Sequence, residues 1–109
     1  EPVRQMSVAE LKDELDSNSV ILIDIRPAEE RALASLDAAR PLNPEVMEEI
    51  EAMPKDTALA FLCHHGRRSN LAAEHFRKNG FTNVSNVAGG IDAWSKEIDP
   101  DIPLYTGTN

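Results

Sequence analysis

The sequence predicts an α/β fold in which a parallel β-sheet of about four or five strands carries helices on both faces. Short apolar runs, typical of buried strands, alternate with stretches of helical periodicity, and glycine, proline and N-cap residues mark their boundaries. The chain has 109 residues, of which 41% are hydrophobic and 28% charged. These values suit one globular domain spanning residues 1–109.

Two continuous apolar runs define the centre of the predicted sheet. Residues 20–23 end at Asp24, and residues 58–62 lead directly into Cys63. Such runs are typical of strands that are buried on both faces. Parallel sheets bind ligands at the carboxyl ends of their strands, which here carry Asp24 with Arg26, and Cys63. Two shorter strands are expected at residues 38–42 and 84–87.

Helix signals fill the segments between these strands. Ser7 and Glu10 form a capping-box signature, and Asn43 with Pro44 provides an N-cap followed by a proline at the first helical position. Further helices are expected after Arg26-Pro27, from about residue 69 to residue 79 with Gly80 as the stop, and after Gly89-Gly90.

The overall charge excludes several classes of partner. A net charge of −8 disfavours non-specific binding to nucleic acids or anionic membranes, both of which need a basic surface.

No apolar run reaches the length of about 20 residues that a transmembrane helix needs, and no signal peptide is visible at the N-terminus. The single cysteine cannot form an internal disulfide, so we expect a cytoplasmic location.

The segment Phe-Leu-Cys-His-His-Gly-Arg-Arg-Ser-Asn, residues 61–70, contains that cysteine. Cys63 ends a strand and a helix is expected about six residues later, so the loop between them must curl tightly, which Gly66 permits. A curled loop before a helix start points backbone N–H groups inward and forms an anion cradle. Arg67 and Arg68 add positive charge. We therefore expect the Cys63 sulfur to be a thiolate near neutral pH.

A simpler interpretation is that Cys63 is a small buried hydrophobic residue, as most lone cysteines are. The apolar residues before it agree with this interpretation. The two arginines and the glycine after it do not, because an inert cysteine does not need them. For Asp24 and Arg26 two roles stay open. In the first, Asp24 accepts hydrogen bonds from the Cys63 loop or from Arg68 and holds the loop in shape. In the second, Asp24 and Arg26 only cap the next helix and pair with Glu29 or Glu30.

The loop Cys63-His64-His65-Gly66-Arg67-Arg68-Ser69 resembles the active-site loop of rhodanese domains, a family of sulfurtransferases. The stretch from residue 63 to residue 94 is also similar to rhodanese domains fused to glutaredoxins in bacteria. One departure is Ala-Ser-Leu at residues 34–36, where the family usually has a Gly-His-Ile-like stretch. Further similarity lies in Asp24-Ile25-Arg26, Ala72-Ala73, Gly80-Phe81, Asn86-Val87, Gly89-Gly90 and Ala93-Trp94.

This resemblance implies a rhodanese-like three-layer fold and a ping-pong reaction. Cys63 would take the outer sulfur of a donor such as thiosulfate and pass it, as a persulfide, to cyanide or a thiol. Asp24 and Arg26 would support the loop, and no cofactor or metal would be needed. A glutaredoxin or thioredoxin-like protein is a candidate partner. The substrate-binding residues would be His64, His65, Gly66, Arg67, Arg68 and Ser69.

Three alternatives to sulfur transfer can be compared with the sequence. A cysteine phosphatase needs an arginine six positions after the cysteine, where this chain has Ser69. A metal site would need Cys63, His64, His65 and His75 to converge, yet adjacent histidines on a tight loop rarely do so, and His75 suits partly buried packing better. A persulfide carrier or protein-interaction module, with little turnover of its own, is the third alternative, and the sequence does not separate it from an enzyme.

Overall fold

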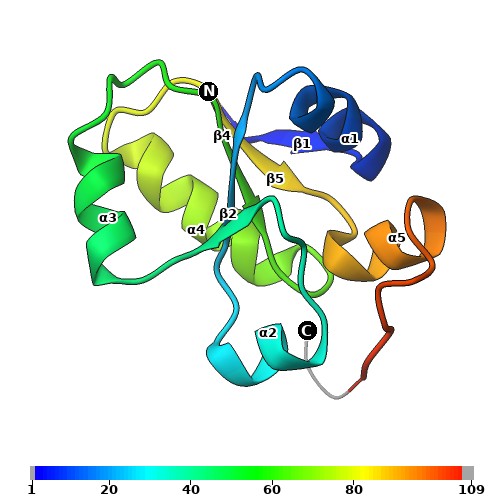
Figure 1. Ribbon diagram of the computed structural model, residues 1–109. Coiled ribbons are helices and arrows are strands. Elements are labelled where there is room, and N and C mark those ends of the chain that lie inside the picture. The colour runs from blue at the N-terminus through cyan, green and yellow to red at the C-terminus, as the bar shows by residue number, and fades with distance from the viewer. Residues whose placement is uncertain (1, 107–109) are drawn as a thin grey trace.

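A parallel sheet of five strands organises residues 2–106, the part of the chain that this computed structural model describes (Figure 1). Its strand order is β1-β5-β4-β2-β3, and every neighbouring pair is parallel. This confirms the predicted α/β architecture. The strands are β1 (Arg4–Met6), β2 (Ile21–Asp24), β3 (Ala39–Pro41), β4 (Leu59–Leu62) and β5 (Val84–Val87).

Strand β4 lies at the centre of the sheet, and all four of its residues are buried. It pairs with β2 in a register that places Asp24 opposite Leu62. The backbone N–H of Ile25 continues this pairing by donating to the Leu62 carbonyl at 3.0 Å. Asp24 and Cys63 therefore leave neighbouring strands at the same edge of the sheet, as the strand-end argument predicts.

Helices cover both faces of the sheet (Figure 1). On one face α3 (Pro44–Glu51) and α4 (Arg67–Lys78) bury Val46, Ile50 and Phe76 against the strands. On the other face α1 (Val8–Asp16) and α5 (Gly90–Glu97) bury Leu11 and Ile91. The short helix α2 (Ala28–Leu33) lies at the carboxyl edge of the sheet. Among the described residues, no helix has the length and apolar character that crossing a membrane requires.

The predicted helix starts at Ser7 and Asn43 are confirmed. Ser7 and Glu10 form a complete capping box, and the Asn43 side chain accepts a hydrogen bond from the Val46 N–H with Pro44 at the start of the helix. Strand β1 was not predicted, because it has three residues and only Met6 is buried. The expected start of α4 near residue 69 is wrong, since the helix already begins at Arg67.

Candidate active site

Cys63 follows β4 directly, and none of its surface is exposed. Its Sγ accepts a hydrogen bond from the backbone N–H of Gly66 at 3.1 Å and lies 3.2 Å from Oγ of Ser69. Gly66 is the N-cap of α4, so the sulfur lies at the positive end of that helix. The Gly66 N–H is one donor of the kind that the predicted anion cradle requires.

The tight turn before α4 depends on glycine. Gly66 has a φ of +103°, and a Cβ added there would lie 3.2 Å from both the Val87 carbonyl oxygen and the Gly89 nitrogen. The Gly89-Gly90 turn approaches the loop even more closely, because a Cβ on Gly90 would overlap the His64 carbonyl group. After this turn, the Ile91 N–H donates to the Cys63 carbonyl at 2.9 Å. The β5–α5 turn thus fixes the backbone of the cysteine loop.

Ser69, in the first turns of α4, connects Cys63 to a buried polar side chain of β5. Ser69 is fully buried, and its Oγ donates to Oδ1 of Asn86 at 2.5 Å. Nδ2 of Asn86 donates to the Gly66 carbonyl at 3.0 Å and to Oε1 of Gln5, on β1, at 2.8 Å. All the hydrogen-bonding atoms of this amide are therefore engaged, and its Oδ1 can only face Ser69.

Asp24 and Arg26 form a buried ion pair with each other. Nε and Nη2 of Arg26 donate to the two carboxylate oxygens of Asp24 at 3.0 and 2.6 Å, and the Arg26 N–H also donates to Asp24. The prediction that Asp24 accepts from the loop or from Arg68 is wrong, because Arg26 reaches back over two residues and occupies the carboxylate. Burial alone would lower the pKa of Arg26, but its hydrogen bonds to Asp24 and Tyr105 outweigh this and raise it.

Arg68 binds Glu30 of α2 instead. Its Nη1 and Nη2 donate to the two carboxylate oxygens at 2.7 and 3.0 Å, and this hydrogen bonding raises the pKa of Arg68. The hydroxyl of Tyr105 donates to the same carboxylate at 2.7 Å and accepts from Nη1 of Arg26 at 2.9 Å. A continuous chain of polar contacts therefore joins Asp24 and Arg26 through Tyr105 and Glu30 to Arg68.

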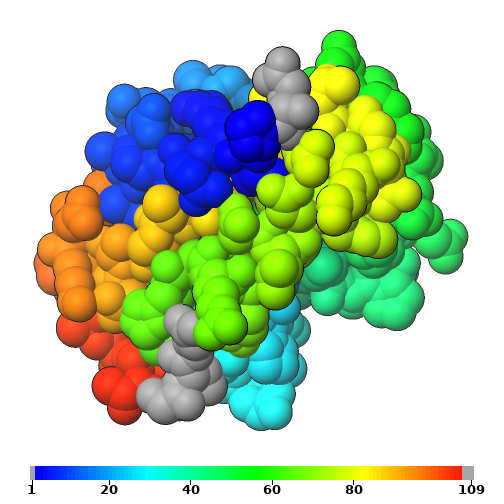
Figure 2. Space-filling model, turned by 180° about the vertical axis from the view of Figure 1, so that it is seen from behind, coloured from blue at the N-terminus to red at the C-terminus, as the bar shows by residue number. Residues whose placement is uncertain are grey.

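The irregular segment that contains Tyr105 lies beside the cysteine loop. The Tyr105 ring stacks on the buried His64 ring with 3.8 Å between centroids and an angle of 8° between the planes. Figure 2 shows this red segment and the cyan α2 on either side of the green start of α4. Arg67, in contrast, is exposed at the start of α4. His65 is 44% exposed, and its Nε2 lies 3.9 Å from the Asp92 carboxylate.

A family model for the rhodanese-like domain matches residues 7–97 of the chain. The chain belongs to the rhodanese-like domain family. This confirms the resemblance that rested on the cysteine loop and the motifs after it.

The domain matches parts of longer proteins. It is 34% identical over 98 residues to adenylyltransferase and sulfurtransferase MOCS3-1 of Zea mays, covering 83% of this chain and 21% of the relative. It is 33% identical over 100 residues to the probable adenylyltransferase/sulfurtransferase MoeZ of Mycobacterium tuberculosis, covering 88% and 26%. The chain thus spans about a fifth to a quarter of the length of these relatives.

Two solved structures match the domain over most of its length. The rhodanese-related protein from Thermoplasma volcanium is 27% identical, with a TM-score of 0.74, and the match covers 94% of this chain and 99% of that one. The rhodanese-like domain protein from Staphylococcus aureus is 25% identical with a TM-score of 0.73, covering 95% and 100%. These similarities agree with the five-stranded architecture.

One group of side chains in the rhodanese-like domain could contact a metal ion. Among the described residues, His64, His65 and Asp92 bring ligand atoms within 4.8 Å of one another. The two imidazole rings contact each other, with centroids 3.9 Å apart and planes inclined by 31°, and adjacent histidines on a tight loop rarely converge on one ion. His75 is outside this group. Its ring packs edge-on against Phe76 with 5.3 Å between centroids, as a packing role requires, but the residue is exposed, so the expected partial burial is wrong.

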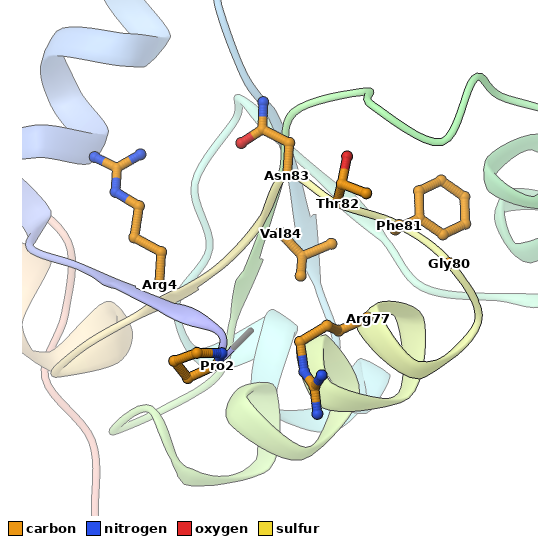
Figure 3. Close-up of a pocket in the computed structure, with 8 residues that line it drawn as sticks. All are labelled: Pro2, Arg4, Arg77, Gly80, Phe81, Thr82, Asn83 and Val84. Atoms are coloured by element: carbon orange, nitrogen blue, oxygen red, sulfur yellow. The ribbon is translucent and has the colours of Figure 1, made fainter.

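A hollow of about 550 Å³ lies at the amino end of β5 (Figure 3). Cys63 lies at the other edge of the sheet, where the parallel strands end. Arg4 and Arg77 line it, together with Pro2 and Phe81. Both arginines already bind acidic groups, since Arg4 pairs with Glu10 and Glu14 and Arg77 pairs with Glu74. The hollow therefore offers little uncompensated charge.

Three residues beside the loop were not predicted to lie there, namely Glu30, Asn86 and Tyr105, although the sequence suggests Glu30 as a possible partner of Arg26 and places Asn86 within a motif. Asn86 had a detectable signal, because an amide between the valines of a short strand must find buried partners. Tyr105 is the only tyrosine of the chain but lies in an irregular segment. Glu30 is one of two adjacent glutamates, and nothing in the local sequence separates it from the exposed Glu29.

Proposed function

We propose that residues 1–109 form one rhodanese domain that transfers a sulfane sulfur through a persulfide on Cys63. The observation that carries this proposal is the position of Sγ, which accepts the Gly66 N–H at the start of α4. A backbone donor and the positive end of a helix both favour negative charge on the sulfur. The same donor suits the persulfide, which is also an anion.

The reaction has two balanced steps. With thiosulfate as the donor, the Cys63 thiolate attacks the outer sulfur, a bond forms between the two sulfurs, and the bond to the sulfite group breaks. Sulfite leaves with the electron pair, and Cys63 holds a persulfide anion. An acceptor such as cyanide or a thiolate then attacks the outer sulfur, and the electron pair returns to Sγ. Covalent storage thus divides the transfer into two easier displacements.

The loop residues divide the remaining work. Arg67 is exposed and recruits the anionic donor, while the charge of Arg68 is largely balanced by Glu30. His64 and His65 contribute mainly through the backbone that encloses the bound anion, and Ser69 offers a hydroxyl beside Sγ. Asp24 and Arg26 support the loop indirectly, through Tyr105 and Glu30.

The burial of Cys63 adds a requirement to this mechanism. Because the residue is fully buried, a donor can reach Sγ only after atoms around the loop move. Small donors need a smaller opening than protein-bound persulfides. We therefore propose thiosulfate, or a persulfide at the end of a mobile segment, as the donor.

The relatives suggest how the domain is used. One is named as an adenylyltransferase and sulfurtransferase and the other as a probable one, which supports sulfur transfer. A thiol is the acceptor that we propose. A glutaredoxin or thioredoxin-like protein stays a candidate partner, and the cytoplasm stays the predicted location. The alternative function is that of a persulfide carrier with little turnover of its own.

Mass spectrometry of the intact protein tests the proposal. After incubation with thiosulfate, we expect the mass to increase by one sulfur atom and to return to its original value when cyanide is added. Cys63→Ser should show no increase. The absence of a cyanide-labile sulfur on the unmodified protein would refute the proposal. Thiocyanate formation over many turnovers would then separate an enzyme from a carrier.

A further inference from the structure

Cys63 and Asn86 compete for the single hydroxyl hydrogen of Ser69. Its hydroxyl carries a single hydrogen, and Oγ has two close neighbours that can accept it. Sγ of Cys63 lies at 3.2 Å and Oδ1 of Asn86 at 2.5 Å. Ser69 can therefore donate to the sulfur or to the amide, but not to both at full strength.

The other hydrogen bonds of Asn86 hold its amide group in one orientation. Nδ2 gives its two hydrogens to Oε1 of Gln5 and to the Gly66 carbonyl, which fixes the amide with Oδ1 toward Ser69. When the Ser69 hydrogen points at Oδ1, the oxygen Oγ presents a lone pair to Sγ, which suits a thiol that donates its own proton. When the hydrogen points at a thiolate, the two oxygens face each other at 2.5 Å without a hydrogen between them.

We propose that Asn86 is a positioning residue that restrains the Ser69 hydroxyl proton from Cys63 and thereby favours the thiol over the thiolate. This inference deepens the proposed function, because it concerns the nucleophile of that reaction. Asn86 acts through Ser69. Its contribution opposes that of the Gly66 N–H, which donates to Sγ.

Other charged and titratable groups also surround Cys63. Their effects on the sulfur are shared by matched variants, so comparing the shift caused by Asn86→Ala with and without the Ser69 hydroxyl isolates the path through Ser69. These groups are Arg67 and Arg68 of α4, Glu30 of α2, His64 and His65 of the loop, Asp92 and Lys96 of α5, and Asp24, Arg26 and Tyr105 at the same edge of the sheet.

The test is the rate of Cys63 alkylation by iodoacetamide as a function of pH, which does not require any sulfurtransferase activity. In Asn86→Ala the hydrogen of Ser69 is released to the sulfur, so we expect the midpoint of the profile to move by about one unit to lower pH. In Asn86→Asp a carboxylate holds that hydrogen more strongly, and its negative charge also disfavours a thiolate, so the midpoint should move to higher pH. Because that charge acts without Ser69, the comparison in a Ser69→Ala background decides whether the path runs through the hydroxyl.

Two controls complete the design. Asn83→Asp makes the same chemical change at an exposed position at the other end of β5 and should leave the profile unchanged. In a Ser69→Ala background, adding Asn86→Ala should cause no further shift, since the path through the hydroxyl is gone. Equal shifts with and without Ser69 would overturn the proposal, and this comparison remains decisive if Asn86→Asp does not fold. A missing persulfide together with the predicted shifts would reject the proposed function alone.

Discussion

Arg68 and Glu30 form a bidentate ion pair between α4 and α2, with N–O distances of 2.7 and 3.0 Å. The Glu30 side chain is 8% exposed and that of Arg68 is 31% exposed. The pair joins the helix that follows the cysteine loop to the helix at the carboxyl edge of β2. One of the two arginines that were expected to attract the donor is therefore engaged within the protein.

Replacing Glu30 by glutamine should destabilise the domain. The variant places an amide opposite the Arg68 guanidinium and removes a charged acceptor from Tyr105, so we expect a loss of about 1–3 kcal/mol in the free energy of unfolding. The lower part of this range is favoured, because Arg68 is about a third exposed and water screens the pair. Urea unfolding measures the change. Glu29→Gln alters the same charge at an exposed neighbouring position and should have little effect, so equal losses would contradict the assignment.

Charge reversal should separate the two arginines of α4. Arg67→Glu replaces an exposed cation near the sulfur, so the KM for thiosulfate should rise several-fold while the urea midpoint stays the same. Arg68→Glu sets two carboxylates against each other at Glu30, so both KM and stability should suffer. Steady-state kinetics and unfolding on the same preparations check this difference. An unchanged KM in both variants would refute the role of the arginines in donor binding.

Gly90 should tolerate substitution much less well than Gly80. Both have a positive φ, +61° and +101°, so alanine is strained by about 1–2 kcal/mol at either position. At Gly80 a Cβ meets only the Lys55 side chain at 3.9 Å, whereas at Gly90 it overlaps the backbone of the cysteine loop. Gly90→Ala should therefore cost about 1–3 kcal/mol more than Gly80→Ala and displace Cys63. Equal unfolding free energies would show that the loop yields without strain.

Tyr105 offers a direct titration of the site, because it is the only tyrosine in the chain. Burial of the phenol and its hydrogen bond to Glu30 raise its pKa above the usual value of about 10. The absorbance midpoint of the native protein should therefore lie above that of the protein in denaturant. A midpoint at or below the denatured value would contradict this environment.

The same shift predicts how stability depends on pH. Below about pH 10 the phenol is protonated in both the folded and the unfolded chain, so its full contribution is present. As the pH rises further, the unfolded chain releases its proton first, and the contribution is lost. The unfolding free energy should therefore fall less steeply at alkaline pH in Tyr105→Phe than in the unmodified protein, and equal slopes would exclude the phenol as the cause.

Most of the sheet was predictable because its central strands are buried on both faces. The apolar runs before Asp24 and Cys63 locate β2 and β4 to within one residue. Strand β1 escaped detection, since two of its three residues are exposed at an edge. The start of α4 was placed two residues late, because the positive φ of Gly66 lets the helix begin directly after the turn.

The site was predictable only where its chemistry lies in one contiguous segment. Cys63, Gly66 and the arginines adjoin one another, so the sequence alone suggests an anion cradle. The partner of Arg68 is 38 positions away, and the contact between Tyr105 and Glu30 spans 75 positions. Which acidic group a given arginine reaches depends on how α2 packs beside α4, and no local pattern encodes that packing.

Gln5 contacts Asn86 from the first strand, and Tyr105 contacts His64 near the end of the described chain. Segments from the two ends of the described chain therefore meet around the cysteine loop. The surroundings of the sulfur are complete only when both segments have docked, so partial unfolding at either end changes the site before the central strands separate.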